Sequence, residues 1–373
     1  MSHDAYTRLL HAALGREEGS PSAPSIELAS ARLLTGDTAA SPYAYLRLGN
    51  PTWEALERAL GVLEDADALV FASGQAASFA VMLALGASGK RFVVPHDGYY
   101  GTRKVAGMLG PFGVETVPVD LADLDAVRAV MAPGRSVLWA ESPTNPSLRV
   151  LDLVALAQIA TEAGAPFVVD NTTATAALQR PLDLGATVTV TSLTKSTSGH
   201  ADVVLGSVAT RDPVLRDMLR MWRAQAGSIA GPFEAWLAHR GVLTLPLRIA
   251  RQSESAEALA RHLARHPRIR RVRHPALEIS TLEIARRQMP NGFGPLLSFE
   301  LDGDAEATER VLAAAKIFRC ATSFGGVEST WERRARWASE TAPESLVRVS
   351  VGLEAVADLI ADVDQALKVV SQG

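Results

Sequence analysis

Short apolar runs alternate with amphipathic segments through the first half of the chain. The amphipathic pattern predicts helices over residues 53–64 and 74–85, the first with Leu56, Leu60 and Leu63 on one stripe. The apolar runs predict strands at residues 68–71, 91–94, 136–139, 166–169, 187–190 and 202–206. Short apolar strands that alternate with helices are typical of a mostly parallel sheet covered on both faces. The pattern therefore predicts an α/β fold.

The pattern changes after about Arg223. Residues 233–262 are predicted to be mostly helical, with a break near Pro246, and apolar residues at helical spacing from Val356 predict a last helix. Further strands are predicted at residues 270–273, 295–301 and 346–350. The chain thus divides into a Ser-, Ala- and Pro-rich arm (1–44), a large domain (45–228) and a smaller C-terminal α+β domain (229–373).

Length and composition fit this division. A chain of 373 residues is too long for one ordinary core, and its hydrophobic fraction of 47% and charged fraction of 21% are those of a globular protein. The net charge of −4 gives no basic surface for nucleic acid or an anionic membrane, so neither is expected as a partner. Arginine clusters at 268–273 and 333–336 are interpreted as solvated or ion-paired faces.

The single cysteine, Cys320, excludes an intramolecular disulfide, and its apolar neighbours predict a buried residue rather than a nucleophile. The chain has no apolar run of about 18 residues that could span a membrane, and its start lacks the basic-then-apolar pattern of a secretory peptide. These features predict a cytoplasmic protein.

Two predicted strands each end in a charged residue. Asp170 ends the strand at 166–169, and Lys195 follows the strand at 187–190 within a hydroxyl-rich stretch. Carboxyl ends of strands form the binding edge of an open α/β sheet. A lysine and an aspartate there suit pyridoxal phosphate, because the lysine forms a Schiff base and the aspartate keeps the pyridine nitrogen protonated. The less favoured alternative for Asp170 is a routine helix cap.

A phosphate site is predicted where the strand at 68–71 turns into the next helix. Ser73, Gly74 and Gln75 would direct helix N-terminal N–H groups at the anion, and Ser192 and Thr194 would add hydroxyl donors. The alternative for Ser73 is an ordinary helix cap.

Three further observations bear on the substrate. Tyr99 follows a strand end and could stack on the ring and transfer protons, although composition does not separate it from Tyr100. Arg348 lies in an apolar strand and suits an amino-acid carboxylate, with a solvent-facing edge position as the alternative. The histidines have no metal-ligand spacing, so no metal is expected, and the glycine fingerprints of nucleotide sites are absent from the sequence.

Nine segments in register resemble the cysteine/methionine-metabolism family of pyridoxal-phosphate enzymes, which includes cystathionine γ-synthase, cystathionine γ- and β-lyases and methionine γ-lyase. They are Tyr45-Leu-Arg47-Leu-Gly-Asn-Pro-Thr52, Ser73-Gly-Gln75, Asp97-Gly-Tyr99-Tyr-Gly-Thr102, Glu141-Ser-Pro-Thr-Asn145-Pro146, Asp170-Asn-Thr172, Ser192-Leu-Thr-Lys195, Arg240-Gly-Val-Leu-Thr-Leu245, Ser323-Phe-Gly-Gly-Val-Glu-Ser329 and Arg348-Val-Ser-Val-Gly-Leu-Glu354. Each is weak alone, but together they are specific.

The resemblance implies a fold type I architecture and a homotetramer built as a dimer of dimers. It also implies that Tyr45 and Arg47 hold the phosphate of the neighbouring subunit. Asn145 would contact the ring hydroxyl, and Ser323 would join Arg348 at the carboxylate of a small amino-acid substrate.

The chain departs from the family at the distal end of the substrate site. Members that handle cystathionine commonly carry acids where this chain has Ala44 and Thr322, and residues 330–337 replace a longer family segment. Arg333, Arg334 and Arg336 of that segment could enter the pocket instead.

The expected activity is that of a sulfur amino-acid lyase, of the cystathionine γ-lyase type. Cystathionine γ-synthase, which performs γ-replacement on an O-acylhomoserine, and methionine γ-lyase are the alternatives within the family. Outside it, the alternatives are a non-catalytic binding protein on the same fold and a nicotinamide dehydrogenase.

Overall fold

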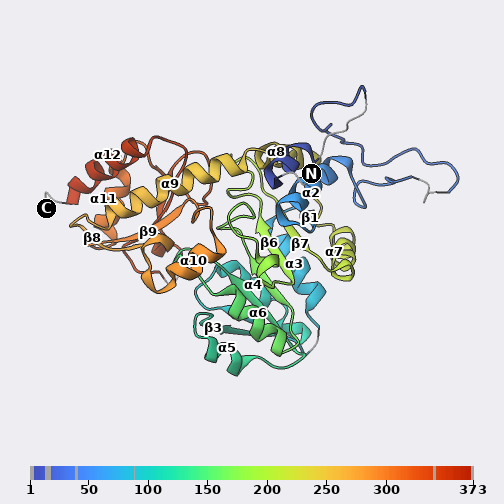
Figure 1. Ribbon diagram of the computed structural model, residues 1–373, viewed down its shortest axis with the longest axis horizontal. Helices are drawn as coiled ribbons and strands as arrows, with labels where there is room; N and C mark the ends of the chain where they lie inside the picture. Colours follow the sequence, from blue (N-terminus) through green and yellow to red (C-terminus); the bar gives the residue numbers. More distant parts are fainter. Residues whose placement is uncertain (1–3, 13–17, 38–40, 88, 339–341, 371–373) are drawn as a thin grey trace.

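The structure is a computed structural model that describes residues 4–12, 18–37, 41–87, 89–338 and 342–370. Its named strands form two sheets, one of seven strands and one of five. Figure 1 shows the two sheets in separate lobes, with the smaller sheet and its helices in orange and red.

The larger sheet is mostly parallel, as predicted. Its strands are β1 (Asp67–Phe71), β2 (Arg91–Pro95), β3 (Glu115–Val119), β4 (Ser136–Glu141), β5 (Phe167–Asp170), β6 (Val188–Ser192) and β7 (Gly206–Thr210). The strand order is β1-β7-β6-β5-β4-β2-β3, and only β7 runs antiparallel to its neighbours.

Helices cover both faces of this sheet, which explains why its central strands are almost wholly apolar. In β4, Val137 and Trp139 join the core on one face, while Leu138 and Ala140 join the core on the other. The helices of this lobe are α2 (Pro51–Glu64), α3 (Gly74–Leu85), α4 (Tyr100–Gly107), α5 (Leu124–Val130), α6 (Leu153–Glu162), α7 (Pro213–Ala226) and α8 (Pro232–Val242). The α/β prediction is thereby confirmed.

The smaller sheet has the order β10-β11-β12-β9-β8 and is antiparallel except for the β10–β11 pair. Its strands are β8 (Ile269–Arg273), β9 (Leu296–Leu301), β10 (Arg319–Cys320), β11 (Thr330–Arg333) and β12 (Leu346–Ser350), and its helices are α10 (Leu282–Gln288), α11 (Ala305–Ala314) and α12 (Val356–Leu367).

Helix α9 (Leu245–Leu263) links the two lobes. Its first turns place Leu245 and Ile249 in the core that α2 and α8 share, and its later turns place Leu259 and Leu263 in the core of the smaller sheet. Pro246 lies in the first turn of α9, where a proline is tolerated, so the predicted break separates α8 from α9. The predicted domain bounds stay predictions.

Three local expectations differ from the structure. The strand predicted at 202–206 is wrong, because β7 begins at Gly206; the Leu205 carbonyl accepts from the Thr194 N, and the Leu205 N donates to the Thr194 Oγ1. Strand β3 was not predicted, since Pro118 interrupts its pattern, which an edge position permits. Cys320 is exposed rather than buried, because it lies in the short edge strand β10.

The described part of the arm begins with α1 (Ala5–His11), which packs on α2, and continues as the extended blue segment of Figure 1. An isolated β-bridge between Ala31 and Tyr45, together with hydrogen bonds to Asn50, Thr52 and Trp236, joins the described part of this segment to the body. Within the described residues, no helix is long and apolar enough to cross a membrane.

Candidate active site

A cavity of about 320 Å³ lies at the carboxyl ends of the central strands of the larger sheet and is closed by residues of the smaller lobe. Ten of the predicted site residues line it, namely Ser73, Gly74, Gln75, Tyr99, Asn145, Asp170, Ser192, Thr194, Lys195 and Arg348. The structure therefore gathers residues that are far apart in the sequence into one site, as expected from the strand ends.

Lys195 lies in a tight turn after β6. Two hydrogen bonds fix this turn, one from the Thr194 N to the Leu205 carbonyl and one from the Leu205 N to the Thr194 Oγ1. The Lys195 Nζ donates to the Ser323 Oγ at 2.6 Å. Burial, and then the positive charges of Arg348 and Arg334, lower the pKa of Lys195 to about 8. A substantial part of the amine is thus neutral near physiological pH, as a nucleophile or a base requires.

Asp170 ends β5 directly opposite Glu141 at the end of β4. No helix begins at Asp170, so the alternative of a helix cap is wrong; its Oδ1 accepts from the Thr172 N in a turn. Burial raises the pKa of Asp170 although Thr172 and Lys195 lower it. A nearby cation stabilises the anionic form of a buried carboxyl group. A protonated pyridine nitrogen is a cation of this kind.

The start of α3 has the close backbone approach that a phosphate site needs. The Ser73 Oγ accepts from the Ala76 N, so Ser73 is indeed a cap, while the first N–H groups of a helix have no intrahelical acceptor. A Cβ on Gly74 would come within 2.8 Å of the Ser192 Cβ, and one on Gly206 within 2.3 Å of the Ser73 carbonyl oxygen. These glycines, with the hydroxyls of Ser192 and Thr194, fit a phosphate group.

Glu141, which we had not predicted as a site residue, holds the loop that carries Tyr99. Its Oε2 accepts from the Tyr99 N at 2.6 Å, and its Oε1 accepts from the Asn145 N at 2.8 Å. Burial, followed by the charge of Asp170, raises the pKa of Glu141 well above its usual value. The position of this carboxylate at the end of an apolar strand, within the segment 141–146 that resembles the family, was the available signal.

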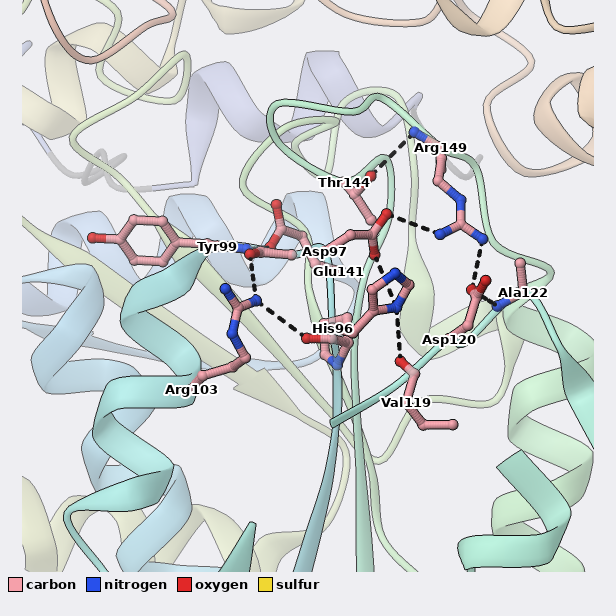
Figure 2. A network of polar contacts seen from close by, with 12 residues as sticks. His96, Asp97, Tyr99, Arg103, Val119, Asp120, Ala122, Glu141, Thr144 and Arg149 are labelled. Atoms are coloured by element: carbon pink, nitrogen blue, oxygen red, sulfur yellow. Dashed lines mark hydrogen bonds and ion pairs between the residues drawn. The ribbon is translucent and has the colours of Figure 1, made fainter. Parts of the chain in front are cut away.

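A second layer of ion pairs supports the same loop (Figure 2). Arg149 pairs with Asp97 at 2.9 Å and with Asp120 at 2.6 Å, and the Arg103 Nη1 donates to the Gly98 carbonyl at 2.9 Å. The ring of Tyr99 points away from these pairs. Sequence patterns gave no sign of Arg149, because its partners come from separate loops.

Tyr99 and Tyr100 both line the cavity, with ring centroids 5.0 Å apart. Burial, followed by Tyr100 and the nearby carboxylates Asp170 and Glu141, raises the pKa of Tyr99 to about 12. The Tyr99 phenol is therefore protonated at neutral pH and lies close enough to Asp170 to sense its charge.

Arg348 comes from β12, which lies between β11 and β9, and only 4% of the residue is exposed. The alternative of a solvent-facing edge position is therefore wrong. Its guanidinium donates to the Asn145 Oδ1 at 3.1 Å, to the Ser323 carbonyl at 2.7 Å and to the Glu332 Oε2 at 3.2 Å. Glu332 is fully buried and was not predicted.

The three arginines of the departing segment have different surroundings. Arg333 pairs with Glu309 and Glu344, as expected of an ion-paired face. Arg334 is buried and lines the cavity together with Trp337 and Thr322, whereas neither Arg336 nor Ala44 is among the described residues that line it.

Tyr45 and Arg47 lie outside the cavity of their own chain. The Arg47 Nη1 donates to the Ala224 carbonyl at 2.9 Å, and its guanidinium lies 5.5 Å from the centre of the Tyr45 ring. Their expected role in a neighbouring subunit stays a prediction. Among the described residues, no group of three or more His, Cys, Asp or Glu side chains is placed to hold a metal ion.

Comparisons with known proteins identify the family of the chain. The family model of the Cys/Met metabolism PLP-dependent enzymes matches residues 7–368. A cystathionine gamma-synthase of Mycobacterium tuberculosis is 42% identical over 335 residues, which cover 87% of this chain and 86% of the relative. A solved cystathionine gamma-lyase of Micromonospora echinospora is 36% identical, with a TM-score of 0.92 over 98% of this chain and 100% of that one.

A solved cystathionine gamma-synthase of Xanthomonas oryzae is 33% identical, with a TM-score of 0.95 and full coverage of both chains. The fold type I architecture is confirmed by these neighbours, and the two alternatives outside the family are excluded. The chain belongs to the Cys/Met metabolism PLP-dependent enzymes, and pyridoxal phosphate is its cofactor.

Proposed function

We propose that this enzyme is a lyase that cleaves cystathionine by α,γ-elimination to cysteine, 2-oxobutyrate and ammonia, with one water consumed. The observation that carries the proposal is the position of Lys195 in one cavity with Tyr99, Asp170 and Arg348. These residues supply a base, a proton donor, a counter-charge for the cofactor ring and a cation for the substrate carboxylate.

The cofactor would be held by residues on the sheet side of the cavity. The N–H groups after Ser73 and the hydroxyls of Ser192 and Thr194 would bind the phosphate, and Asp170 would pair with the ring nitrogen. Asn145 would contact the ring hydroxyl. Pyridoxal phosphate supplies the electron sink that stabilises negative charge at the substrate Cα.

Lys195 moves the protons at the substrate carbons. Its lowered pKa provides a neutral amine that takes the α-proton and then transfers the β-proton. Arg348 binds the α-carboxylate, with Ser323 beside it, and this contact orients the Cα proton toward the Lys195 amine.

Tyr99 assists the departing thiolate. Its phenol keeps its proton at neutral pH, since its pKa is raised to about 12. A thiolate that leaves Cγ accepts a hydrogen bond from this phenol, which stabilises the negative charge on sulfur and assists its protonation to the cysteine product. The ring of Tyr99 would also stack on the cofactor.

A γ-replacement of the cystathionine gamma-synthase type is the second candidate, because relatives with that name are 38–42% identical to this chain. The same groups serve both reactions, since elimination and replacement share the loss of the α-proton and of the γ-substituent. Methionine γ-lyase activity is a third possibility within the same chemistry.

We also propose that the enzyme works as a tetramer in which Tyr45 and Arg47 bind the phosphate held by a neighbouring copy. The exposed side chain of Tyr45 and the position of both residues outside their own cavity support this arrangement.

Product analysis of the cofactor-loaded enzyme tests the activity. Cystathionine, methionine, cysteine and O-acetylhomoserine are supplied in turn, the last with and without cysteine. Cysteine and 2-oxobutyrate from cystathionine are the expected products. Turnover of the acylhomoserine alone, with cysteine incorporated, would establish the replacement reaction instead.

A further inference from the structure

Glu332 joins three cavity residues of the smaller lobe. Its Oε2 accepts from the Arg334 Nη1 at 2.6 Å and from the Arg348 Nη2 at 3.2 Å, and its Oε1 accepts from the Trp337 Nε1 at 2.6 Å. Two guanidinium groups thus meet at one carboxylate oxygen. We call Glu332, Arg334, Trp337 and Arg348 the arginine wall.

Both arginines are buried and line the same cavity as the Lys195 amine. Arg334 and Arg348 are 5% and 4% exposed, and both line the cavity. The positive charge of each contributes to the lowered pKa of Lys195, so both guanidinium groups act on the interior of the site. The α-carboxylate of an amino-acid substrate would pair with one of these two guanidinium groups. The role of the other guanidinium group toward the substrate is then still to be explained.

We propose that Arg334 binds a second carboxylate at the far end of the substrate side chain, while Arg348 binds the α-carboxylate. This inference rests on the proposed function and assigns the distal specificity of the same site. A guanidinium has five N–H donors in a planar fork, so an ion pair with Glu332 is compatible with a further carboxylate. Trp337 adds an apolar surface beside Arg334 for the methylene groups that precede that carboxylate.

The arrangement selects a substrate class. Amino acids whose side chains end in a carboxylate, such as cystathionine and O-succinylhomoserine, would bind more tightly than methionine or O-acetylhomoserine, which end in a methyl group. An acidic side chain in place of Ala44 or Thr322 would bind the distal ammonium group of cystathionine. The arginine wall would instead bind the distal carboxylate of the same molecule. The buried setting strengthens the interaction relative to a surface ion pair.

A pair of unreactive ligands tests the inference on the cofactor-loaded enzyme. L-2-aminosuberate places a second carboxylate as far from Cα as cystathionine does, and L-2-aminooctanoate has a methyl group in its place. Neither has a leaving group at Cγ. Calorimetry is expected to show that the wild-type enzyme binds the dicarboxylate about 10- to 100-fold more tightly, the range of a charge-assisted hydrogen-bonded pair.

Arg334→Gln is expected to abolish this preference and leave the affinity for L-2-aminooctanoate unchanged. Arg334→Lys keeps the positive charge but not the planar set of N–H donors, so this variant should retain part of the preference for the dicarboxylate. Arg333→Gln is the matched control, because Arg333 is the adjacent residue and pairs with Glu309 and Glu344 outside the cavity. It should retain the full preference.

Two results would overturn the inference. Equal affinity of the wild-type enzyme for the two ligands would remove the second carboxylate site. An equal loss of affinity for both ligands in Arg334→Gln would mean that Arg334 acts only by positioning Arg348 through Glu332. Both readouts are independent of turnover, so they remain informative if cystathionine is not cleaved, whereas the product analysis above decides the proposed activity.

Discussion

The two walls of the cavity are built in different ways. On the sheet wall, Asp170, Glu141 and the Lys195 turn follow directly from the ends of β5, β4 and β6, and backbone hydrogen bonds fix them. On the arginine wall, Arg334 and Trp337 come from a single 3₁₀ turn (Arg334–Arg336) after β11 and the residue that ends it, and the side chain of one residue, Glu332, holds them.

The difference assigns separate tasks to the walls. The sheet wall carries the groups to which we assign the holding or moving of protons, namely Lys195, Tyr99 and Asp170, whose pKa values are all shifted. The arginine wall carries the guanidinium groups, which keep their charge and to which we assign the binding of carboxylates. Changes to the first should therefore reduce turnover, and changes to the second should reduce affinity or stability.

The largest expected effect is that of Lys195→Ala. Without its amine the enzyme has no base at the substrate Cα, so kcat with cystathionine should fall about 10⁴-fold. Lys90→Ala is the control, since Lys90 is on the surface and its Nζ donates to the Gly134 carbonyl. A kcat of Lys195→Ala within tenfold of wild type would contradict the assignment of the base.

Tyr99→Phe should reduce kcat roughly 10²- to 10³-fold while the variant retains its cofactor, measured by its visible absorption. The reason is that the variant lacks the phenolic proton but keeps the ring. Tyr100→Phe is the matched control, because Tyr100 is the adjacent residue and also lines the cavity. If Tyr100→Phe were the slower variant, the proton-donor role would pass to Tyr100.

The same contrast explains what the sequence could predict. The sheet wall was predictable because Asp170 and Lys195 follow apolar β-branched runs, and a run that ends in a charge places that charge at a known edge of the sheet. Strands β2, β4, β5 and β6 were predicted within a few residues for the same reason.

The arginine wall was not predictable in this way. Glu332 and Arg334 lie in a charged stretch, Glu332–Arg336, whose composition resembles a solvated face, and only the pairing of β11 with β12 brings Glu332 opposite Arg348. Glu141 was missed for a related reason, since its carboxylate accepts from the backbone N–H of Tyr99 in another loop as well as from that of Asn145 in its own. Contacts of this kind depend on tertiary packing, which no local pattern encodes.

Replacing a buried carboxylate on each wall sharpens the comparison. Glu332→Gln removes the partner of two buried cations and should lower the free energy of unfolding by about 3 kcal/mol. Glu141→Gln should lower the free energy of unfolding by about 1 kcal/mol. The raised pKa of Glu141 means that this carboxyl group carries less negative charge to lose, and the glutamine oxygen still accepts one of the two backbone N–H groups. Urea unfolding of both variants measures the difference, and equal losses would contradict the distinction between the walls.

The smallest expected effect is a shift in the pH dependence of cofactor loading. Only the neutral Lys195 amine attacks the cofactor aldehyde, so the loading rate of the cofactor-free enzyme should rise with pH and level off above about 8, well below the 10.5 of an unperturbed lysine. Arg348→Met removes a positive charge that disfavours the Lys195 ammonium, which raises the pKa of Lys195 and moves the midpoint to higher pH. Arg333→Met, which removes an arginine that pairs outside the cavity, should leave the midpoint unchanged. A midpoint that does not move in Arg348→Met would mean that burial alone lowers the pKa, and that the arginine wall acts on the substrate without tuning the base opposite it.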